Sequence, residues 1–544
     1  MQLYPASIVF LAILALFAVR GAQNVLMLMV AMIPFGMFSV VGLPSVGGLS
    51  LLAVNLCAAT LIGLGSIALV ARLIRGDRVP IEPATLILAL FAIYTVFSAT
   101  VLVRLFQGDL MVFALSRGAT GVKVSIHFSW EKVWLGPSNS NISQTLYVLI
   151  ACGLFVIASH VLARHGTAFG VRCLAFGAGL NVLLGAMDLL ALDPLLSIIR
   201  TAGYSLSNEA TVNGVPRVIG GFSEASSFGA ASSMFCAFFA TASLRERRLG
   251  HAALALANGG FTLMALSSTG IISLGVTCLV LGPQALAAMP RRVSRKTLIL
   301  AAAGLFGITL TISGMLLFTT APDMIGKVVQ NLVLDKSQSS SGMERTAWAM
   351  GGLEALRDTW GLGAGTGSLR SNGLIFVLLG SVGLIGTAAF LAFLWAAFGG
   401  RASEGQASVL SSARVAALAC LTSMLLASTV PDPGVPLIFL AALAVAAKAP
   451  RGFTGRSPRG EIAFVKSMSA PGDMHLDPMR GGDEYRDIPR ARIVGLFVSA
   501  AESKAWRRSV ARTRSAILRS KLRPAGTERA AVVFGGLPKM LGAA

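Results

Sequence analysis

Residues 373–398 read GLIFVLLGSVGLIGTAAFLAFLWAAF and contain no charged side chain. An apolar segment of roughly 20 residues or more matches the hydrocarbon core of a bilayer and predicts a transmembrane helix. The same reasoning predicts further spans at 4–19, 25–43, 51–74, 84–103, 146–163, 169–190, 226–243, 251–267, 269–288, 297–318, 414–430 and 435–449. The sequence therefore predicts an all-α polytopic membrane protein with about 12–13 transmembrane helices.

The overall composition supports this fold class. Of the 544 residues, 55% are hydrophobic and only 13% are charged, and the mean hydropathy is +0.75. Soluble domains carry about 25% charged residues, so this chain could not cover a water-soluble fold of its size with polar surface. Soluble enzyme classes are largely excluded.

The excess of positive charge marks one side of the membrane. The chain carries 45 Lys and Arg against 24 Asp and Glu, a net charge of +21. Span counting places five basic connections on the same side: Arg72, Arg75 and Arg78; Arg164 and His165; Arg245–Arg248; Arg291–Lys296; Arg401 and Arg414. The positive-inside rule makes that side cytoplasmic. This charge therefore has a topological role, and nucleic acid is not an expected partner.

The composition changes near residue 450. Residues 451–544 hold 18 Lys and Arg against 8 Asp and Glu, with no apolar run long enough to span a bilayer. We therefore expect a membrane domain, 1–449, and a basic, partly disordered cytoplasmic tail, 450–544. Within the tail, Ala491–Leu522 could form a basic amphipathic helix on anionic lipid, although a solvated tail without a specific partner is the commoner arrangement.

No metal or cofactor site is expected from the sequence. The six cysteines lie in apolar stretches without metal-ligand spacing, and the five histidines are scattered. We interpret the cysteines as small hydrophobic residues.

The side opposite the basic connections carries three longer loops, at 104–145, 191–225 and 319–372. By the positive-inside rule, such loops should be poor in arginine. Five arginines go against this bias: Arg200, Arg217, Arg345, Arg357 and Arg370. Cations near the outer membrane surface need a reason, and binding of an anion is the leading one. We therefore expect the external loops to form the active site.

The first candidate motif, residues 215–229, reads VPRVIGGFSEASSFG and precedes a predicted span. Gly220 and Gly221 permit a close approach between backbone and ligand. Ser223 and Glu224 indicate a helix start, whose free N–H groups favour an anionic ligand. Arg217 and Glu224 could serve a ligand or form an ion pair that ties the loop to the helix, and the sequence favours neither.

The second motif, residues 341–360, predicts an amphipathic helix at the membrane surface, with Trp348 and Trp360 at the level of the lipid headgroups. We expect Arg357, near the end of this helix, to interact with the helix dipole or with lipid. Arg345 lies near the beginning, at the positive end of the dipole. That unfavourable position favours a role in ligand binding.

The third motif is the glycine-rich stretch GLGAGTGSLRSNG at 361–373. The backbone N–H groups of such a loop, with Gly363, Gly365, Gly367 and Ser371 in it, can surround phosphate oxygens. A simple turn is the commoner explanation. The phosphate interpretation gains weight because all three motifs are predicted to face the same compartment.

Taken in order, these motifs resemble the O-antigen polymerase/ligase superfamily of Wzy-type membrane glycosyltransferases, and most closely its bacterial exopolysaccharide-polymerase branch. The resemblance is carried by Arg217 with residues 220–229, by Met343–Trp348 and by Gly361–Ser371. The segment Gly380–Gly386 fits the next helix of the family. The similarity covers 1–449 in hydropathy and about 215–390 in motifs.

This resemblance implies a GT-C-like helical enzyme in the bacterial inner membrane. Such an enzyme polymerises undecaprenyl-diphosphate-linked oligosaccharide repeat units into exopolysaccharide or O-antigen on the periplasmic face, by metal-independent, inverting glycosyl transfer. Carried over, Arg217, Arg345 and Arg370 would bind the diphosphate, and Glu224 would orient or deprotonate the acceptor hydroxyl. The implied partners are the lipid-linked oligosaccharide and a chain-length regulator or flippase.

Two other functions stay open. A ligase of the same superfamily would transfer the glycan to a lipid or protein acceptor, but that branch often has a His-Asn pair where this chain has Ser371 and Asn372. A transporter or flippase for lipid-linked oligosaccharides should carry charges at mid-membrane in two related halves. Here the charges lie mostly at the ends of the predicted spans.

Overall fold

The structure is a computed structural model that describes residues 4–43, 49–76, 81–115, 122–123, 131–202, 211–212, 215–288 and 340–449. Its helices are α1 (Pro5–Val19), α2 (Ala22–Ala31), α3 (Ala53–Ile74), α4 (Pro83–Phe97), the π-helical turn η1 (Ser98–Leu102), α5 (Val103–Leu105), α6 (Asn139–His165), α7 (Thr167–Leu189), α8 (Asp193–Leu196), α9 (Ala225–Glu246), α10 (Leu249–Met264), α11 (Ser268–Ala288), α14 (Ser340–Asp358), α15 (Leu374–Phe398), α16 (Ala407–Ala427) and α17 (Gly434–Lys448). Its strands are β1 (Ser39–Leu43), β2 (Leu49–Leu52), β3 (Met111–Phe113), β4 (Val122–Lys123), β5 (Glu131–Trp134), β6 (Thr211–Val212) and β7 (Val215–Pro216). The predicted span at 297–318 and the predicted tail, 450–544, lie outside the described residues.

Within the described residues, eight helices are long and apolar enough to cross a membrane. They are Ala53–Ile74, Pro83–Leu105, Asn139–His165, Thr167–Leu189, Ala225–Glu246, Ser268–Ala285, Leu374–Phe398 and Ala407–Ala427. Helices α1, α2 and α17 are apolar but shorter. This confirms a mostly helical protein of the multi-pass membrane type, whereas the total of about 12–13 spans stays a prediction.

The bundle is held together by apolar packing with a few buried polar contacts. Helix α17 is apolar on all sides and almost wholly buried, and it packs against α6 and α16. A helix of that composition belongs in the interior of a protein or membrane. Elsewhere, the Asn181 Nδ2 on α7 donates to the Ser232 Oγ on α9 at 2.8 Å and to the Asn258 Oδ1 on α10 at 2.9 Å. Such side-chain hydrogen bonds link helices where no water competes.

The predicted span at 25–43 is wrong in its second half. Helix α2 ends at Ala31, and Ser39–Leu43 instead forms β1, which pairs antiparallel with β2. Pro34, with no N–H to donate, cannot continue a helix. At Gly36, a Cβ atom would lie 2.5 Å from the Phe222 ring, so the chain passes the 220–222 segment at close range. The apolar residues of this stretch therefore pack inside the protein rather than span.

Two other predicted spans have different bounds. The span predicted at 146–163 begins earlier, at Asn139, because Ser138 caps α6: its backbone N–H donates to the Asn141 Oδ1 at 2.8 Å. The span predicted at 251–267 is α10, which has 16 residues and falls short of a full crossing. The sequence had predicted a loop as far as residue 145 because the first residues of α6 are polar.

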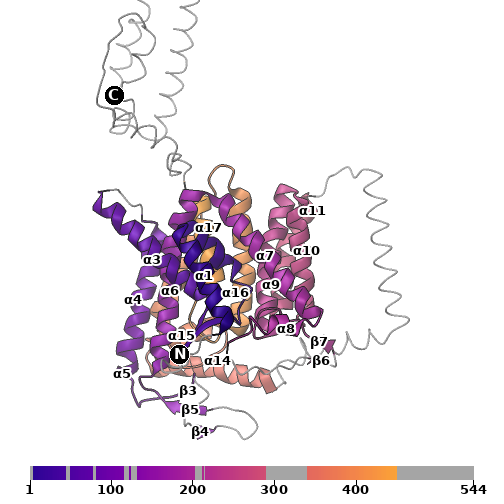
Figure 1. The fold of residues 1–544 in the computed structure, drawn as a ribbon. Coiled ribbons are helices and arrows are strands. Elements are labelled where there is room, and N and C mark those ends of the chain that lie inside the picture. The colour runs from indigo at the N-terminus through magenta and orange to yellow at the C-terminus, as the bar shows by residue number, and fades with distance from the viewer. Residues whose placement is uncertain are drawn as a thin grey trace, which may run out of the picture. The chain divides into compact units, whose positions relative to one another are not determined.

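The bundle has two different ends (Figure 1). At one, which we call the basic end, α3, α6 and α9 end and α16 begins; the Ser408 Oγ on α16 donates to the Glu246 Oε1 on α9 at 2.9 Å. The other, the loop end, carries α8, the sheet β3–β5–β4, the pair β6–β7 and α14 (Figure 1). The described basic connections lie at the basic end, in agreement with span counting.

Helix α14 lies across the loop end, at a steep angle to the bundle helices (Figure 1). The helix predicted at 341–360 is confirmed, with the bounds Ser340–Asp358, whereas its amphipathic character and its place at a membrane surface stay predictions. The Lys132 Nζ on β5 forms an ion pair with the Glu354 Oε2 on α14 at 3.1 Å. The small sheet is therefore fastened to α14.

Candidate active site at the loop end

An internal ion pair holds the Gly220–Gly221 turn. The Asp188 Oδ2, near the end of α7, accepts hydrogen bonds from the backbone N–H of Ile219 at 2.6 Å and of Gly220 at 3.1 Å, and its Oδ1 pairs with Arg200. The Arg200 Nε donates to the Gly220 carbonyl oxygen at 3.0 Å. Gly220 has a φ of +54°, a conformation that glycine adopts readily. Arg200, one of the external arginines, is thus engaged in building the turn.

Arg217 and Glu224 lie on either side of this turn. Glu224 is the N-cap residue of α9, with an exposed side chain whose Oε2 accepts a hydrogen bond from the Ser226 Oγ at 2.8 Å. The Arg217 Nε donates to the carbonyl oxygen of Ala265, just after α10, at 3.2 Å. Glu224 forms no ion pair with any residue that the structure describes. Its carboxylate stays accessible at the loop end.

Arg345 lies on α14, and the Arg370 side chain packs against the same helix. The Arg370 guanidinium lies over the Trp348 ring, 4.9 Å from its centroid, and its Nη2 donates to the Leu115 carbonyl oxygen at 3.0 Å. Trp348 follows Arg345 by three positions on α14, so the two share a helix face. The Arg345 side chain makes no hydrogen bond or ion pair within the described part of the chain. Arg370 thus stacks on a tryptophan of the helix that carries Arg345, while Arg217 comes from a separate segment.

The glycine-rich loop is packed rather than open. Several of its backbone N–H groups already have acceptors: Ala364 donates to the Gly380 carbonyl oxygen at 2.8 Å and Gly365 to that of Ser381 at 3.0 Å, while Gly363 donates to the Thr359 Oγ1 at 3.0 Å.

Gly363, Gly365 and Gly367 have positive φ values of 91°, 98° and 79°. A Cβ at any of them would overlap neighbouring backbone. Gly363 therefore lets the loop lie in the break that Gly383 makes in α15, while Gly365 and Gly367 let it pass close to Ser98 of η1 and Ser140 of α6. Their predicted phosphate contacts stay a prediction.

Ser371 is completely buried after this loop, and its hydroxyl has no hydrogen-bond partner among the described residues. The adjacent Asn372 donates from Nδ2 to the Leu426 carbonyl oxygen at 3.2 Å. Asn372 thus anchors the start of α15 against the end of α16. Nothing in its geometry exposes Ser371 to a substrate.

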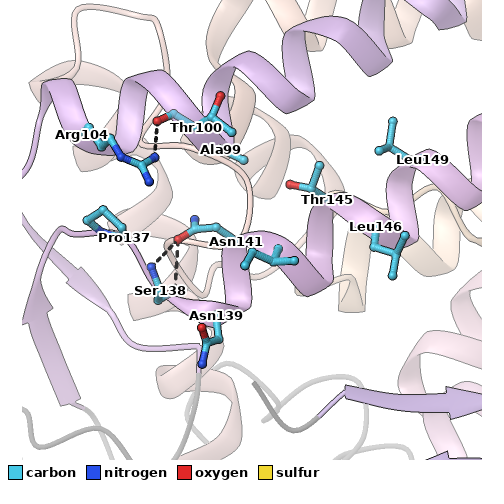
Figure 2. A pocket seen from close by; sticks show the side chains of 11 residues that line it. Ala99, Thr100, Arg104, Pro137, Ser138, Asn139, Asn141, Thr145, Leu146 and Leu149 are labelled. Carbon is cyan, nitrogen blue, oxygen red and sulfur yellow. Dashed lines mark hydrogen bonds between the residues drawn. The ribbon is translucent and has the colours of Figure 1, made fainter. Parts of the chain in front are cut away.

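A pocket that the sequence did not predict lies beside the glycine-rich loop (Figure 2). It has a volume of about 480 Å³ and lies between η1–α5 and the first turns of α6. Arg104, Asn141 and Leu146 are among the residues that line it. The Asn141 Nδ2 donates to the Thr366 carbonyl oxygen and to the Ser368 Oγ, both at 2.8 Å, so the pocket wall is joined to the glycine-rich loop.

One sequence signal could have pointed to this pocket. Arg104 lies directly after the predicted span at 84–103 and on the same predicted side as the five external arginines. It is a further cation against the positive-inside bias. The apolar wall supplied by α6, by contrast, cannot be separated from an ordinary lipid-facing stripe without the fold.

Asp432 is a titratable group in the turn between α16 and α17. Its Oδ1 accepts a hydrogen bond from the Gly434 backbone N–H at 2.9 Å. Burial raises the pKa of its carboxyl to about 6, and the Gly434 hydrogen bond opposes this. Among the described residues, no group of three or more His, Cys, Asp or Glu side chains could hold a metal ion.

Comparisons with known proteins give no assignment. No protein-family model matches the chain, and no curated protein matches it. The chemistry of the loop end must therefore be argued from its own residues.

Proposed function

We propose that this chain is a membrane glycosyltransferase that polymerises lipid-diphosphate-linked oligosaccharide repeat units, acting at its loop end. The observation that carries the proposal is the stacking of the Arg370 guanidinium on Trp348 of α14, the helix that also carries Arg345, at the end of the bundle where the positive-inside rule predicts few cations. An anionic ligand is one reason for arginines at that end, and a diphosphate accepts paired guanidinium hydrogen bonds. The resemblance to the O-antigen polymerase/ligase superfamily and its GT-C-like members agrees with this function.

The reaction requires little beyond charge stabilisation and one base. An acceptor hydroxyl oxygen attacks the anomeric carbon, the bond from that carbon to the diphosphate oxygen breaks, and the electron pair leaves with the lipid diphosphate. Guanidinium groups fixed in a partly dry site stabilise the charge that develops on the leaving group. Attack from the side opposite the leaving group inverts the anomeric centre.

Glu224 is the proposed acceptor of the hydroxyl proton. Its carboxylate is exposed at the loop end and forms no ion pair with a described residue, so it is accessible to a hydroxyl group. A carboxylate positioned within hydrogen-bond reach can take that proton as the new bond forms. Arg217, seven residues before it, is the third proposed diphosphate ligand.

The proposed setting is a bacterial inner membrane, with the loop end on the periplasmic face and the basic end in the cytoplasm. The basic connections gathered at the other end of the bundle support this orientation (Figure 1). Polymerisation at the periplasmic face would need a flippase to deliver the lipid-linked repeat unit and a chain-length regulator to stop growth.

Reconstitution of the full chain in liposomes with a lipid-diphosphate-linked repeat unit tests the function. A ladder of glycans that lengthens by one repeat at a time supports the polymerase. A single transfer, only when another acceptor is added, would instead support a ligase. Movement of the lipid across the bilayer without new glycosidic bonds would support a transporter, and either result would overturn the proposal.

A further inference from the structure

The pocket between η1–α5 and α6 is an open groove with one polar end and exposed apolar side chains along α6 (Figure 2). Ile142, Leu146 and Leu149 are respectively 62%, 40% and 39% exposed, and they recur at helical spacing along α6. Ala99 on η1 forms part of the opposite wall. A groove walled by apolar residues on the outside of a membrane bundle presents a surface suited to a hydrocarbon chain.

The polar end of the groove lies at the level expected for lipid headgroups. Helix α6 has 27 residues and so is about 40 Å long, which exceeds the hydrocarbon core of about 30 Å. Its first turn begins at Asn139, next to Ser138, and both residues line the groove. The positive end of the α6 dipole therefore points into the polar end, where it favours an anion.

Arg104 supplies a full positive charge at the same place. Its Nη1 donates to the Thr100 carbonyl oxygen at 2.5 Å, it is exposed, and it forms no ion pair with a described residue. The Thr145 Oγ1 is buried and has no hydrogen-bond partner in the described part of the chain. Figure 2 shows Arg104 and Thr145 extending from opposite walls toward the space between the helices. A cation and an unpartnered hydroxyl thus line one groove.

We infer that this groove binds a single-chain lipid that carries a phosphate or diphosphate, with the head at Arg104 and the chain along the α6 stripe. The wall is one row of side chains wide, which fits one hydrocarbon chain rather than the two of a bulk phospholipid. The groove also adjoins the candidate active site: Ser138 lines both it and a smaller pocket of about 90 Å³ that reaches Gly367 and Ser368. Assigning this lipid as the carrier of the glycan donor rests on the proposed function.

Photolabelling of the full chain in phosphatidylcholine nanodiscs tests this binding without any glycan acceptor. The probe is geranylgeranyl diphosphate carrying a diazirine on its chain. We expect labelled peptides from 99–104 and 138–149, and loss of labelling with excess unlabelled probe. Arg104→Ala should lower labelling about tenfold, since it removes a hydrogen bond to a charged group. The matched control Arg357→Ala, an exposed arginine paired with Asp358, should leave it unchanged.

A second pair of variants addresses the apolar wall. Leu146→Trp fills the groove and should abolish labelling of α6, whereas Leu183→Trp on the exposed face of α7 should not. Unchanged melting temperatures show that each variant is folded. Labelling that Arg104→Ala and Leu146→Trp both leave intact would overturn the inference. Competition by phosphatidylglycerol at equal concentration would indicate a bulk-phospholipid site, and by inorganic pyrophosphate a free-phosphate site; both results would also overturn it.

The binding and transfer measurements can reject the lipid site and the proposed function independently. If labelling behaves as expected but liposomes yield no glycan product, the proposed function fails and the lipid site stands. If glycan chains grow normally in Arg104→Ala and Leu146→Trp proteins that no longer bind the probe, the lipid site stands, but its assignment as the carrier site fails while the proposed function is untouched.

Discussion

Arginines on the loop end differ in what surrounds them, and these surroundings suggest different roles. Arg200 is bound to Asp188 and to the Gly220 carbonyl oxygen, so its charge is neutralised inside the protein. Arg370 stacks on Trp348, and Arg345 lies one turn earlier on the same helix. The sequence predicted all three as external arginines. It could not separate them, because Asp188 and Trp348 meet their arginines only in the folded chain.

Arg370→Ala should lower the polymerisation rate by about 10²–10³-fold if its guanidinium stabilises the leaving group. Arg370→Lys keeps the charge but loses the planar, paired hydrogen bonds and the stacking on Trp348, so it should recover little of the rate. The initial rate of chain growth in liposomes measures this. Arg357→Ala, which changes an exposed arginine of α14, is the control. Near-normal rates in both Arg370 variants would exclude this role.

Asp432 should make stability depend on pH between about 4 and 6. Burial raises its folded-state pKa from 3.8 to about 6, so folding favours the protonated form. Stability from this group is therefore complete below about 4, falls as pH rises to about 6, and then stays level. Asp432→Asn keeps the acceptor for the Gly434 N–H and should not show this fall.

Melting temperatures of the wild type and Asp432→Asn should therefore diverge as pH rises from 4 to 6.5, with the variant the more stable above pH 6. Asp109→Asn, at an exposed carboxylate, is the matched control and should follow the wild type. Parallel curves for the wild type and Asp432→Asn would show that Asp432 does not titrate in this range.

The hydrophobic runs in the sequence predicted the long helices well, but they did not show where a short break ends a helix. The spans expected at 51–74 and 373–398 are helices with nearly the same bounds. The run at 25–43 failed because Pro34 and the close passage of Gly36 at Phe222 redirect the chain. The glycine-rich loop was located correctly. The acceptors for the N–H groups of Gly363, Ala364 and Gly365, however, come from α15 and from Thr359, so sequence alone could not show that these groups are occupied.

Gly383→Ala should disrupt the packing of the glycine-rich loop against α15 and so destabilise the protein. Gly383 has a φ of +61°, and a Cβ there would overlap the Gly361 carbonyl oxygen. Overpacking and backbone strain together should cost at least about 2 kcal/mol. Gly179→Ala, on α7 with nothing within 4 Å of the added Cβ, should be neutral or slightly stabilising. Equal melting temperatures for the two variants would contradict this packing.

Asp188→Asn should destabilise the turn before α9 far more than Asp193→Asn. The Asp188 side chain is 10% exposed and that of Asp193 is 75% exposed, although both lie near Arg200. Breaking the buried pair leaves the Arg200 charge with only the exposed Asp193 carboxylate, 3.7 Å away, at a cost of about 3–5 kcal/mol. Thermal unfolding in detergent measures the difference. A small, equal loss in both variants would mean that the turn does not depend on this pair.

For the whole molecule, the sequence predicted a membrane bundle with its basic connections at one end and candidate site residues at the other. Both follow from composition and span order, which one sequence carries. The groove at Arg104 was not predicted, because it needs η1 and α6 to lie side by side. The grouping of Arg345 with Arg370 depends likewise on the loop that returns the chain to α14. Contacts between segments that lie far apart in the sequence can be seen only in the folded chain.

Growth of glycan chains in liposomes containing only this protein and a lipid-diphosphate-linked repeat unit tests the central claim most directly. We expect a ladder of products that lengthens by one repeat at a time with wild-type protein and with Arg357→Ala, and no ladder within the same reaction time with Arg345→Ala or Arg370→Ala. An unextended repeat unit with folded wild-type protein, or an unchanged ladder with both arginine variants, would contradict it.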